Sequence, residues 1–102
     1  MDKRRIELQH LLEHVLHGES VYYQPPESIK MKYPAIIYHR SDIRNLFADD
    51  RPYRQTTAYQ VTVVDKDPDS EIVKRVARLP MCRFDRHYTV DGLNHDVFII
   101  YF

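Results

Sequence analysis

The chain has 102 residues, the length of one domain, and a hydrophobic content of 43% with only two glycines, which excludes a linker or a low-complexity segment. Its 15 basic and 15 acidic side chains cancel, so it lacks the overall positive charge on which non-specific nucleic-acid binding depends. The single cysteine, Cys82, excludes an internal disulfide and a zinc cluster built from cysteines, and is expected to be a small buried hydrophobic side chain.

Membrane and export signals are not apparent in the sequence. No hydrophobic run approaches the roughly 20 residues that span a bilayer. The N-terminal stretch "MDKRRIELQHLLEHVL" lacks the apolar block and the cleavage site of a signal peptide. We therefore expect a protein that stays on the cytoplasmic side of a cell, or in a particle assembled there.

Residues 2–17 predict an amphipathic helix, because their apolar positions recur at helical spacing. One face of this helix would carry Leu8, Leu11, Leu12, Val15 and Leu16. Asp2 is placed to cap its start, and Gly18 is placed to end it in a left-handed conformation.

Two strands are expected to follow this helix. Residues 20–24 predict a short strand, which Pro25 and Pro26 would end because proline has no N–H to donate. A polar loop then leads to Tyr33. This residue is expected to be extended because Pro34 follows it. Residues 35–43 predict the second strand.

The stretch 44–55 is polar and contains an Asp-Asp-Arg-Pro turn signal, so we expect a turn within it. Residues 56–65 then predict the clearest strand of the chain. Its alternation would point Tyr59, Val61 and Val63 to one side, and Gln60 and Thr62 to the other.

A second helix is predicted for residues 71–79, with Pro80 as its end. Its apolar stripe would consist of Ile72, Val73, Val76 and Leu79. A hairpin is predicted last, with strands at 81–90 and 95–102 and a turn at Asp91-Gly92. The final strand is apolar on both faces, so either it is central and covered on two sides or its second face meets a partner.

This order of elements predicts a single α+β domain over residues 1–102. The expected architecture is a mostly antiparallel sheet of four to five strands, with two helices packed on one face.

An acidic turn, "DKDPDSE", places Asp65, Asp67 and Asp69 at every second position, as at the start of a calcium-binding loop. Such a loop needs glycine at its sixth place and glutamate at its twelfth, where this chain has Ser70 and Val76. We therefore expect no metal here, and expect Asp67 or Asp69 to cap the second helix.

The first helix carries His10 and His14 one turn apart, with His17 nearby, on the face opposite the apolar one together with Lys3 and Ile6. Two histidines at this spacing could clamp a divalent metal. No acidic residue with motif spacing accompanies them, so a solvated face or a contact between subunits is the favoured interpretation.

The last hairpin gathers His87, Arg86 and Tyr88, with Arg83 and His95, which are residue types that small ribonuclease toxins use for acid–base chemistry and phosphate stabilisation. Strand alternation divides this set. It places Arg83, Asp85, His87 and Thr89 on one face, and Phe84, Arg86 and Tyr88 on the other. A ribonuclease relying on His87, Arg86 and Tyr88 remains an alternative hypothesis.

The stretches "VYYQPPESIKMKYPAIIY" and "YQVTVVDKDPDSEIVKRVARLP", followed by a closing hairpin, resemble the small tail-completion or tail-terminator proteins of tailed bacteriophages. The resemblance covers nearly all of residues 5–102. The matching positions are Val21-Tyr22, Tyr33-Pro34 with Ile36, Ile37 and Tyr38, Tyr59 with Val61, Thr62 and Val63, the helix Glu71–Leu79, and the strands 83–90 and 96–102.

The resemblance implies a non-enzymatic virion protein of the tail or neck, assembled in the cytoplasm of a bacterial host. Such a protein forms a homo-oligomeric ring, usually a hexamer, that ends the head-proximal side of the tail tube. Its partners would be other copies of itself, the tube protein, the head–tail connector and neck proteins, and the sheath protein if the tail contracts. DNA would pass through the ring without sequence-specific binding, and no cofactor is implied.

The segment 44–55 would then be a protruding loop or long hairpin at a subunit or tube contact. The residues expected at such contacts are Phe47, Asp49, Asp50, Arg51, Tyr53 and Arg54 of this segment, His10 and His14 of the first helix, and Phe98, Ile100 and Phe102 of the last strand. Two alternatives to a terminator stay open besides the ribonuclease: another neck or connector protein, and a monomeric interaction module of a host cell.

Overall fold

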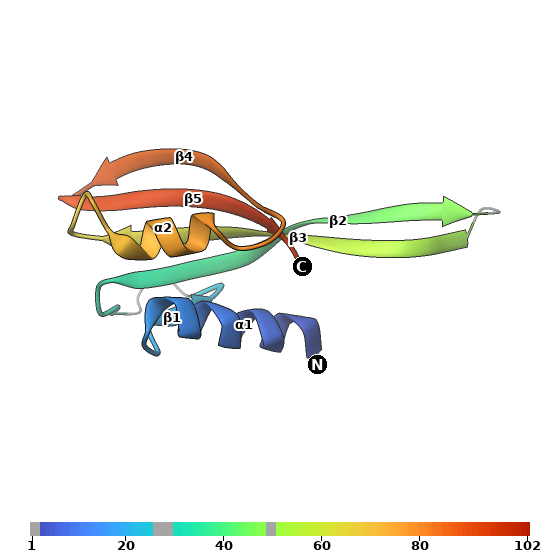
Figure 1. Ribbon diagram of the computed structural model, residues 1–102, viewed down its shortest axis with the longest axis horizontal. Helices are drawn as coiled ribbons and strands as arrows, with labels where there is room; N and C mark the ends of the chain where they lie inside the picture. The colour runs from blue at the N-terminus through green and yellow to red at the C-terminus, as the bar shows by residue number, and fades with distance from the viewer. Residues whose placement is uncertain (1–2, 26–29, 49–50) are drawn as a thin grey trace.

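The structure is a computed structural model that describes residues 3–25, 30–48 and 51–102 (Figure 1). Its elements in chain order are α1 (Lys3–Leu16), β1 (Val21–Tyr23), β2 (Ala35–Ala48), β3 (Arg51–Asp65), α2 (Glu71–Ala77), β4 (Cys82–Val90) and β5 (Leu93–Tyr101). The five strands form one sheet in the order β1-β2-β3-β5-β4. β1 is parallel to β2 and the other neighbours are antiparallel, so the predicted α+β fold is confirmed.

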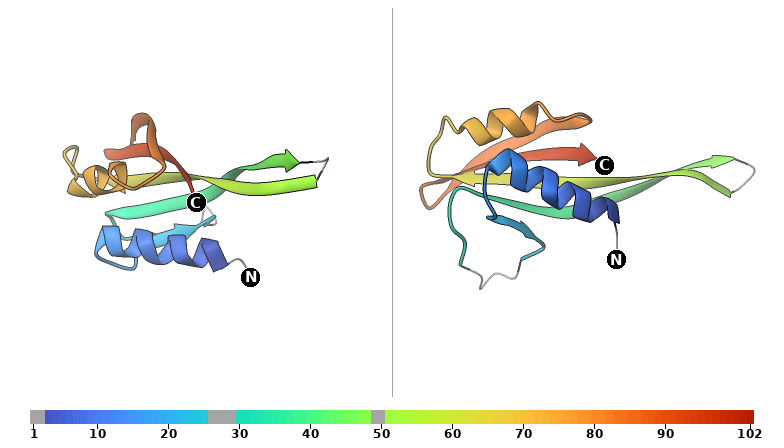
Figure 2. Two further views of the ribbon diagram at one scale, coloured as in Figure 1. Left: turned by 45° about the vertical axis from the view of Figure 1, so that its right-hand side comes forward. Right: turned by 60° about the horizontal axis from the view of Figure 1, so that its bottom comes forward.

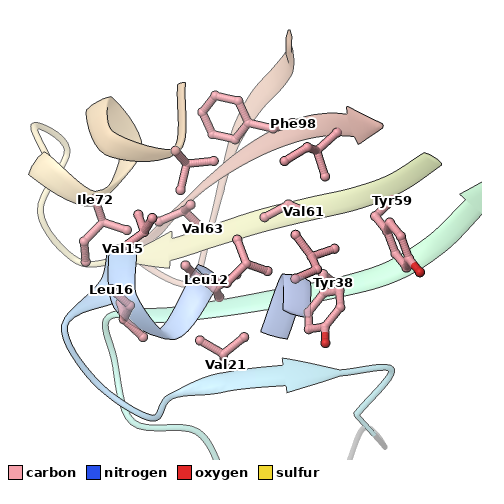
Figure 3. Close-up of a cluster of buried hydrophobic side chains, with 14 residues drawn as sticks. Leu12, Val15, Leu16, Val21, Tyr38, Tyr59, Val61, Val63, Ile72 and Phe98 are labelled. Atoms are coloured by element: carbon pink, nitrogen blue, oxygen red, sulfur yellow. The ribbon is translucent and has the colours of Figure 1, made fainter. Parts of the chain in front are cut away.

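Both helices pack on the same face of the sheet (Figure 2). Alternation along each strand supplies the apolar side chains of this face, as predicted for Tyr59, Val61 and Val63. Figure 3 shows them meeting the apolar stripes of the helices. The buried core consists of Leu8, Leu12, Val15, Leu16, Val21, Ile36, Tyr38, Tyr59, Val61, Val63, Ile72, Val76, Phe98 and Ile100.

The two helices are also linked to each other at one end. The Arg75 guanidinium in α2 donates to the carbonyl oxygen of Val15 over 2.8 Å. This carbonyl belongs to the last turn of α1, where carbonyl groups have no partner within their own helix. Arg75 therefore caps α1 from a position 60 residues further along the chain.

α1 ends one residue earlier than predicted, at a left-handed His17 with φ 61° and not at Gly18. The Gly18 N–H donates to the Glu13 carbonyl, and the His17 N–H donates to the His14 carbonyl. This pair of bonds is the Schellman motif, with His17 in the left-handed position that glycine usually takes. The prediction failed because it assumed that the glycine itself would adopt this conformation. The predicted cap Asp2 lies outside the described residues.

The start of α2 also differs from the prediction. Its N-cap is Ser70, whose hydroxyl accepts a hydrogen bond from the Ile72 N–H over 3.2 Å. The carboxylates of Asp65 and Asp67 instead accept bonds from the N–H groups two residues on, which are those of Asp67 and Asp69. The prediction that Asp67 or Asp69 caps the helix is therefore wrong, because Ser70 directly precedes the first helical residue. α2 ends at Ala77, two residues before the predicted end.

Both strands extend into the segment 44–55. β2 continues to Ala48 and β3 begins at Arg51, so the strand ends predicted at 43 and 56 are wrong. The two strands stay paired up to Ala48 and Arg51. We call residues 42–48 and 51–57 the arm, and the rest of the sheet with its two helices the body. Figure 1 shows the arm extending well beyond the body.

The last hairpin is present, and its turn is at Asp91-Gly92 as predicted, with positive φ at both residues. β5 starts at Leu93, two residues before the predicted start. A β-bulge interrupts the pairing of β4 with β5 between Phe84 and Arg86. β5 lies between β3 and β4, so the helix α2 connects two strands that run in the same direction without being neighbours.

Candidate functional site

The arm is the most distinctive surface of this protein. It accounts for the elongated shape, with principal extents of 51 × 25 × 23 Å (Figure 2). Along the arm, the described pairing of β2 and β3 involves no third strand, because β1 pairs β2 only at 36–38 and β5 pairs β3 only at 58–65. A two-stranded ribbon is marginally stable in water, and its unpaired edges are able to pair with a further strand.

The arm leaves the body at a bulge around Ser41. The Ser41 hydroxyl donates to the Ala58 carbonyl over 3.2 Å, and the Asp42 carboxylate accepts from the Ile43 N–H over 2.8 Å. Bulges increase the local twist and change the direction of a strand. This bulge therefore sets the direction in which the arm projects from the body.

Six predicted contact residues belong to the segment 44–55. The structure places the backbones of Phe47, Arg51, Tyr53 and Arg54 in the arm strands, with Phe47 opposite Pro52. Asp49 and Asp50 lie outside the described residues. The long-hairpin form of the prediction is thus the one that the structure has, and the four described positions come together in the outer part of the arm.

The last strand was expected to offer contact residues too, and for two of them this is wrong. Phe98 and Ile100 are each 1% exposed and lie in the core under the helices. Phe102 is half-buried, with the Arg4 guanidinium 5.3 Å from its ring centroid. The prediction failed because β5 is an interior strand of the sheet, so its apolar pattern serves the core.

The histidines of α1 lie on its outer side, where His10, His14 and His17 are all exposed. The rings of His14 and His17 are 6.4 Å apart and meet edge to face. Within the part of the chain that the structure describes, no group of three or more His, Cys, Asp or Glu side chains could hold a metal ion. The acidic turn is included in that finding, and two of its carboxylates are engaged by backbone N–H groups.

The structure does not bring the proposed ribonuclease residues together. Tyr88 is paired with His95 and stacks on its ring at 4.6 Å, while His87 is paired with Asp96 on the other face. Arg86 is engaged by the carboxylate of Asp85. The predicted division of His87 from Arg86 and Tyr88 is therefore present, although the bulge moves Phe84 to the face of His87.

Two ionisable side chains near β4 have shifted pKa values. Burial raises the pKa of the Cys82 thiol, which contacts the core at its edge. A raised pKa lowers the thiolate fraction, so Cys82 has the character of a structural cysteine. Burial also raises the pKa of Asp96, while the neighbouring charges of His87 and His95 act in the opposite direction.

A polar cluster that sequence patterns did not indicate lies under the first half of α1. The Tyr38 hydroxyl donates to Oε1 of Gln9 and accepts from Arg5 over 3.4 Å, and burial raises its pKa. Gln9 also donates to the Val21 carbonyl over 3.1 Å, and Arg5 lies 4.5 Å from the Tyr23 ring centroid. The only sequence signal was the spacing of Arg5 and Gln9, one turn apart beside the apolar stripe. The cluster fixes α1 over β1 and β2.

The edge strand β4 is an exposed surface that sequence patterns did not identify. Every residue of this strand after Cys82 is exposed, including Phe84, Tyr88 and Val90. Large apolar side chains exposed on an edge strand mark a surface that can pair with another chain.

Comparison with known proteins adds no relative: no protein-family model matches the chain, and no curated protein matches it. Across residues 3–25, 30–48 and 51–102, no helix has both the length and the apolar character that crossing a membrane requires.

Proposed function

We propose that this protein is a structural subunit of a phage virion, a tail-terminator or tail-completion protein that forms a ring on the head-proximal end of the tail tube. It acts by contact and not by catalysis. Its partners are other copies of itself, the tube protein, the connector or neck proteins on the head side, and the sheath protein in a contractile tail. This proposal places the protein in the virion, at the junction of tail and head.

The arm is the observation that carries this proposal. An isolated ribbon of two paired strands is marginally stable, so the arm needs a surface to lie on. The bulge at Ser41 fixes its direction relative to the body. A body with a fixed projecting arm suits a subunit that must reach a neighbour at a constant angle.

Such an arm is compatible with a ring. If the arm of one copy lies on a different surface of the next copy, the contact is heterologous, and heterologous contacts close into a ring when the rotation allows it. The sequence resemblance to tail-terminator proteins and the α+β body with two helices on one face both support this assembly. The neutral charge of the chain also suits a ring through which DNA passes, because a strongly positive channel would retain the DNA.

The test is a variant without the outer arm, in which residues 45–55 are replaced by Asn-Gly. This dipeptide forms a two-residue turn between Arg44 and Thr56, which are already paired, so the body should fold unchanged. The Thr57 carbonyl accepts from the Phe102 N–H on the side of β5, so the backbone groups of Thr56 face β2, as the turn requires. Wild-type protein and variant are mixed with tail tubes grown from the tube protein encoded in the same gene cluster. We expect rings on one end of the tubes by electron microscopy with the wild type, and none with the variant.

A matched control is Asp85→Arg, a charge change on β4 far from the arm, which should still form rings on tube ends. Rings formed equally well by the arm-less variant would contradict the role of the arm. Tubes that never carry the wild-type protein, or flanking genes that encode no virion proteins, would contradict the function.

A further inference from the structure

We propose that two copies of this chain pair through their β4 strands, side by side and antiparallel, to form a two-fold dimer in solution. The partner of the β4 edge is thus a second copy of the same chain. This inference does not depend on the proposed ring function, since it concerns the edge of the body and not the arm.

The hydrogen-bonding direction of β4 is set at both of its ends. The Tyr101 N–H donates to the Met81 carbonyl over 3.0 Å, so the backbone of Met81 faces β5. At the other end, Val90 and Leu93 flank the two-residue turn and also face each other. Backbone groups alternate along a strand, so counting from both ends leaves Cys82, Phe84, His87 and Thr89 with their N–H and C=O groups pointing away from β5. Counted from the two ends of β4, the alternation of backbone groups differs by one residue in the middle of the strand. The β-bulge between Phe84 and Arg86 supplies this extra residue.

These four positions are symmetric about the bond between residues 85 and 86. A second copy of β4 laid antiparallel can therefore place Phe84 opposite His87 and Cys82 opposite Thr89, twice each. In that register every outward-facing backbone group of one strand meets an outward-facing group of the other. No other antiparallel self-pairing keeps all four in register, because a shift sets outward-facing residues against inward-facing ones.

Charge complementarity supports the same register. It places Asp85 of one copy opposite Arg86 of the other, at both sides of the two-fold axis. Within one chain, Asp85 already engages Arg86 and lies 4.0 Å from Arg83, so these side chains share one face of the strand. Charges and bulges usually keep edge strands apart, since most approaching strands do not match them. A copy of β4 does match them, because its charges run in the opposite order when it lies antiparallel.

The exposed apolar side chains find partners in this dimer as well. Phe84 is 54% exposed and Tyr88 41% exposed in the single chain. The register sets Phe84 against His87 and Tyr88 against Arg83, which can lie over its ring. The dimer joins two five-stranded sheets into one ten-stranded sheet.

A two-fold contact closes on itself, so it cannot be the contact that repeats around a ring with one direction. The dimer is therefore the form of the protein away from a tube. It covers the exposed β4 edge, which would otherwise be open to aggregation.

Charge exchange tests the register. Asp85→Arg and Arg86→Asp each place like charges opposite each other twice, so each should weaken the dimer roughly tenfold or more in sedimentation equilibrium at low salt. The double variant Asp85→Arg/Arg86→Asp restores opposite charges and should return the dissociation constant to within about threefold of wild type. Thermal unfolding of all three variants checks that the fold is intact.

A native cysteine allows a second test. In Thr89→Cys the new thiol lies opposite Cys82 of the partner, at roughly 5.5 Å between Cα atoms, which is within reach of a disulfide. The two positions in one chain are seven residues apart on an extended strand, so any disulfide joins two chains. Mild oxidation should yield a covalent dimer. The control His87→Cys, on the same face of β4 but not opposite Cys82, should not.

Three results would overturn the proposal. The first is a wild-type protein that sediments as a monomer up to several hundred micromolar. The second is a concentration-dependent series of larger species in place of one dimer. The third is a dimer that neither responds to the charge exchange nor crosslinks through Thr89→Cys. The ring proposal is tested separately, because Asp85→Arg should lose the dimer and keep tube binding, whereas the arm-less variant should do the reverse.

Discussion

The hairpin of β2 and β3 has two different halves, which meet at the bulge around Ser41. In the body half, residues 35–40 pair with 59–64 under the helices, and Ile36, Tyr38 and Val61 are fully buried. In the arm half the same two strands continue in the same pairing, without helices or further strands in the described structure. Backbone hydrogen bonding is therefore shared by both halves, and burial is not.

This difference shows what each half depends on. The body half is stabilised by apolar area removed from water, which contributes the largest favourable term in folding. The arm half has its ladder bonds, and each such bond contributes only about 1 kcal/mol net. The body should fold alone, and the arm should depend on what it touches.

The largest expected effect comes from the core under the helices. Phe98→Ala removes a side chain that is 1% exposed, so it should lower the free energy of unfolding by about 3–5 kcal/mol. Ile43→Ala, at the base of the arm where the side chain is 42% exposed, should cost about 0.5 kcal/mol or less. Urea denaturation followed by circular dichroism measures both. Equal losses would show that the arm is part of the folding unit.

A smaller effect is expected at the start of α2, where the body depends on one hydroxyl. Ser70→Ala removes the acceptor of the Ile72 N–H and should cost about 1 kcal/mol in the same denaturation experiment. Asp67→Ala is the matched control, since its carboxylate accepts only from Asp69 in an exposed turn. A larger loss of stability for Asp67→Ala than for Ser70→Ala would indicate that the Asp67 carboxylate caps the helix after all.

Burial of the Asp96 carboxyl in the body should lower the stability of the protein at neutral pH. Its folded pKa is raised above the ordinary value of 3.8, so the folded state favours the neutral carboxyl. The stability that this carboxyl contributes is present below pH 3.8 and is lost as the pH rises through the folded pKa. Asp96→Asn should therefore raise the melting temperature at pH 7, with no gain at pH 3. A lower melting temperature for this variant at pH 7 would show that the ionised carboxylate is stabilising instead.

The smallest effect on stability should follow from the largest change in sequence. Replacing residues 45–55 by Asn-Gly removes the outer arm and leaves the buried core untouched. The melting temperature of the remaining body should stay within about 3 °C of wild type by calorimetry. A fall of 10 °C or more would mean that the body and the arm fold together, and the comparison between them would fail.

The body could be predicted from the sequence because burial imposes a pattern. Tyr59, Val61 and Val63 alternate since one face of β3 is covered, and Leu8 and Leu12 recur since one face of α1 is covered. Without such cover the arm carries no pattern, so its polar residues and Pro52 predicted a turn and left a loop and a long hairpin equally open. Proline is tolerated there because the outer edge of the arm has no ladder to complete in the described structure.

The remaining errors in the prediction arose where two local structures are equally compatible with the sequence. Ser70 and Asp69 are both good capping residues, and only the position of the first helical turn decides between them. Phe98 and Ile100 are apolar in a strand that is apolar on both faces, and the sequence alone does not say whether that strand is interior. The bulge in β4 leaves no mark in composition, although it decides which side chains share a face with His87.

The position of β5 has a consequence for how the chain is made. β5 is synthesised after the other four strands, yet it is inserted between β3 and β4 in the sheet. On the ribosome, β4 therefore has no strand to pair with until residues 93–101 emerge, and the core on that side waits for Phe98 and Ile100. α1, β1, β2 and β3 can associate earlier, so synthesis divides the molecule into an early half and a late half that meet at β3.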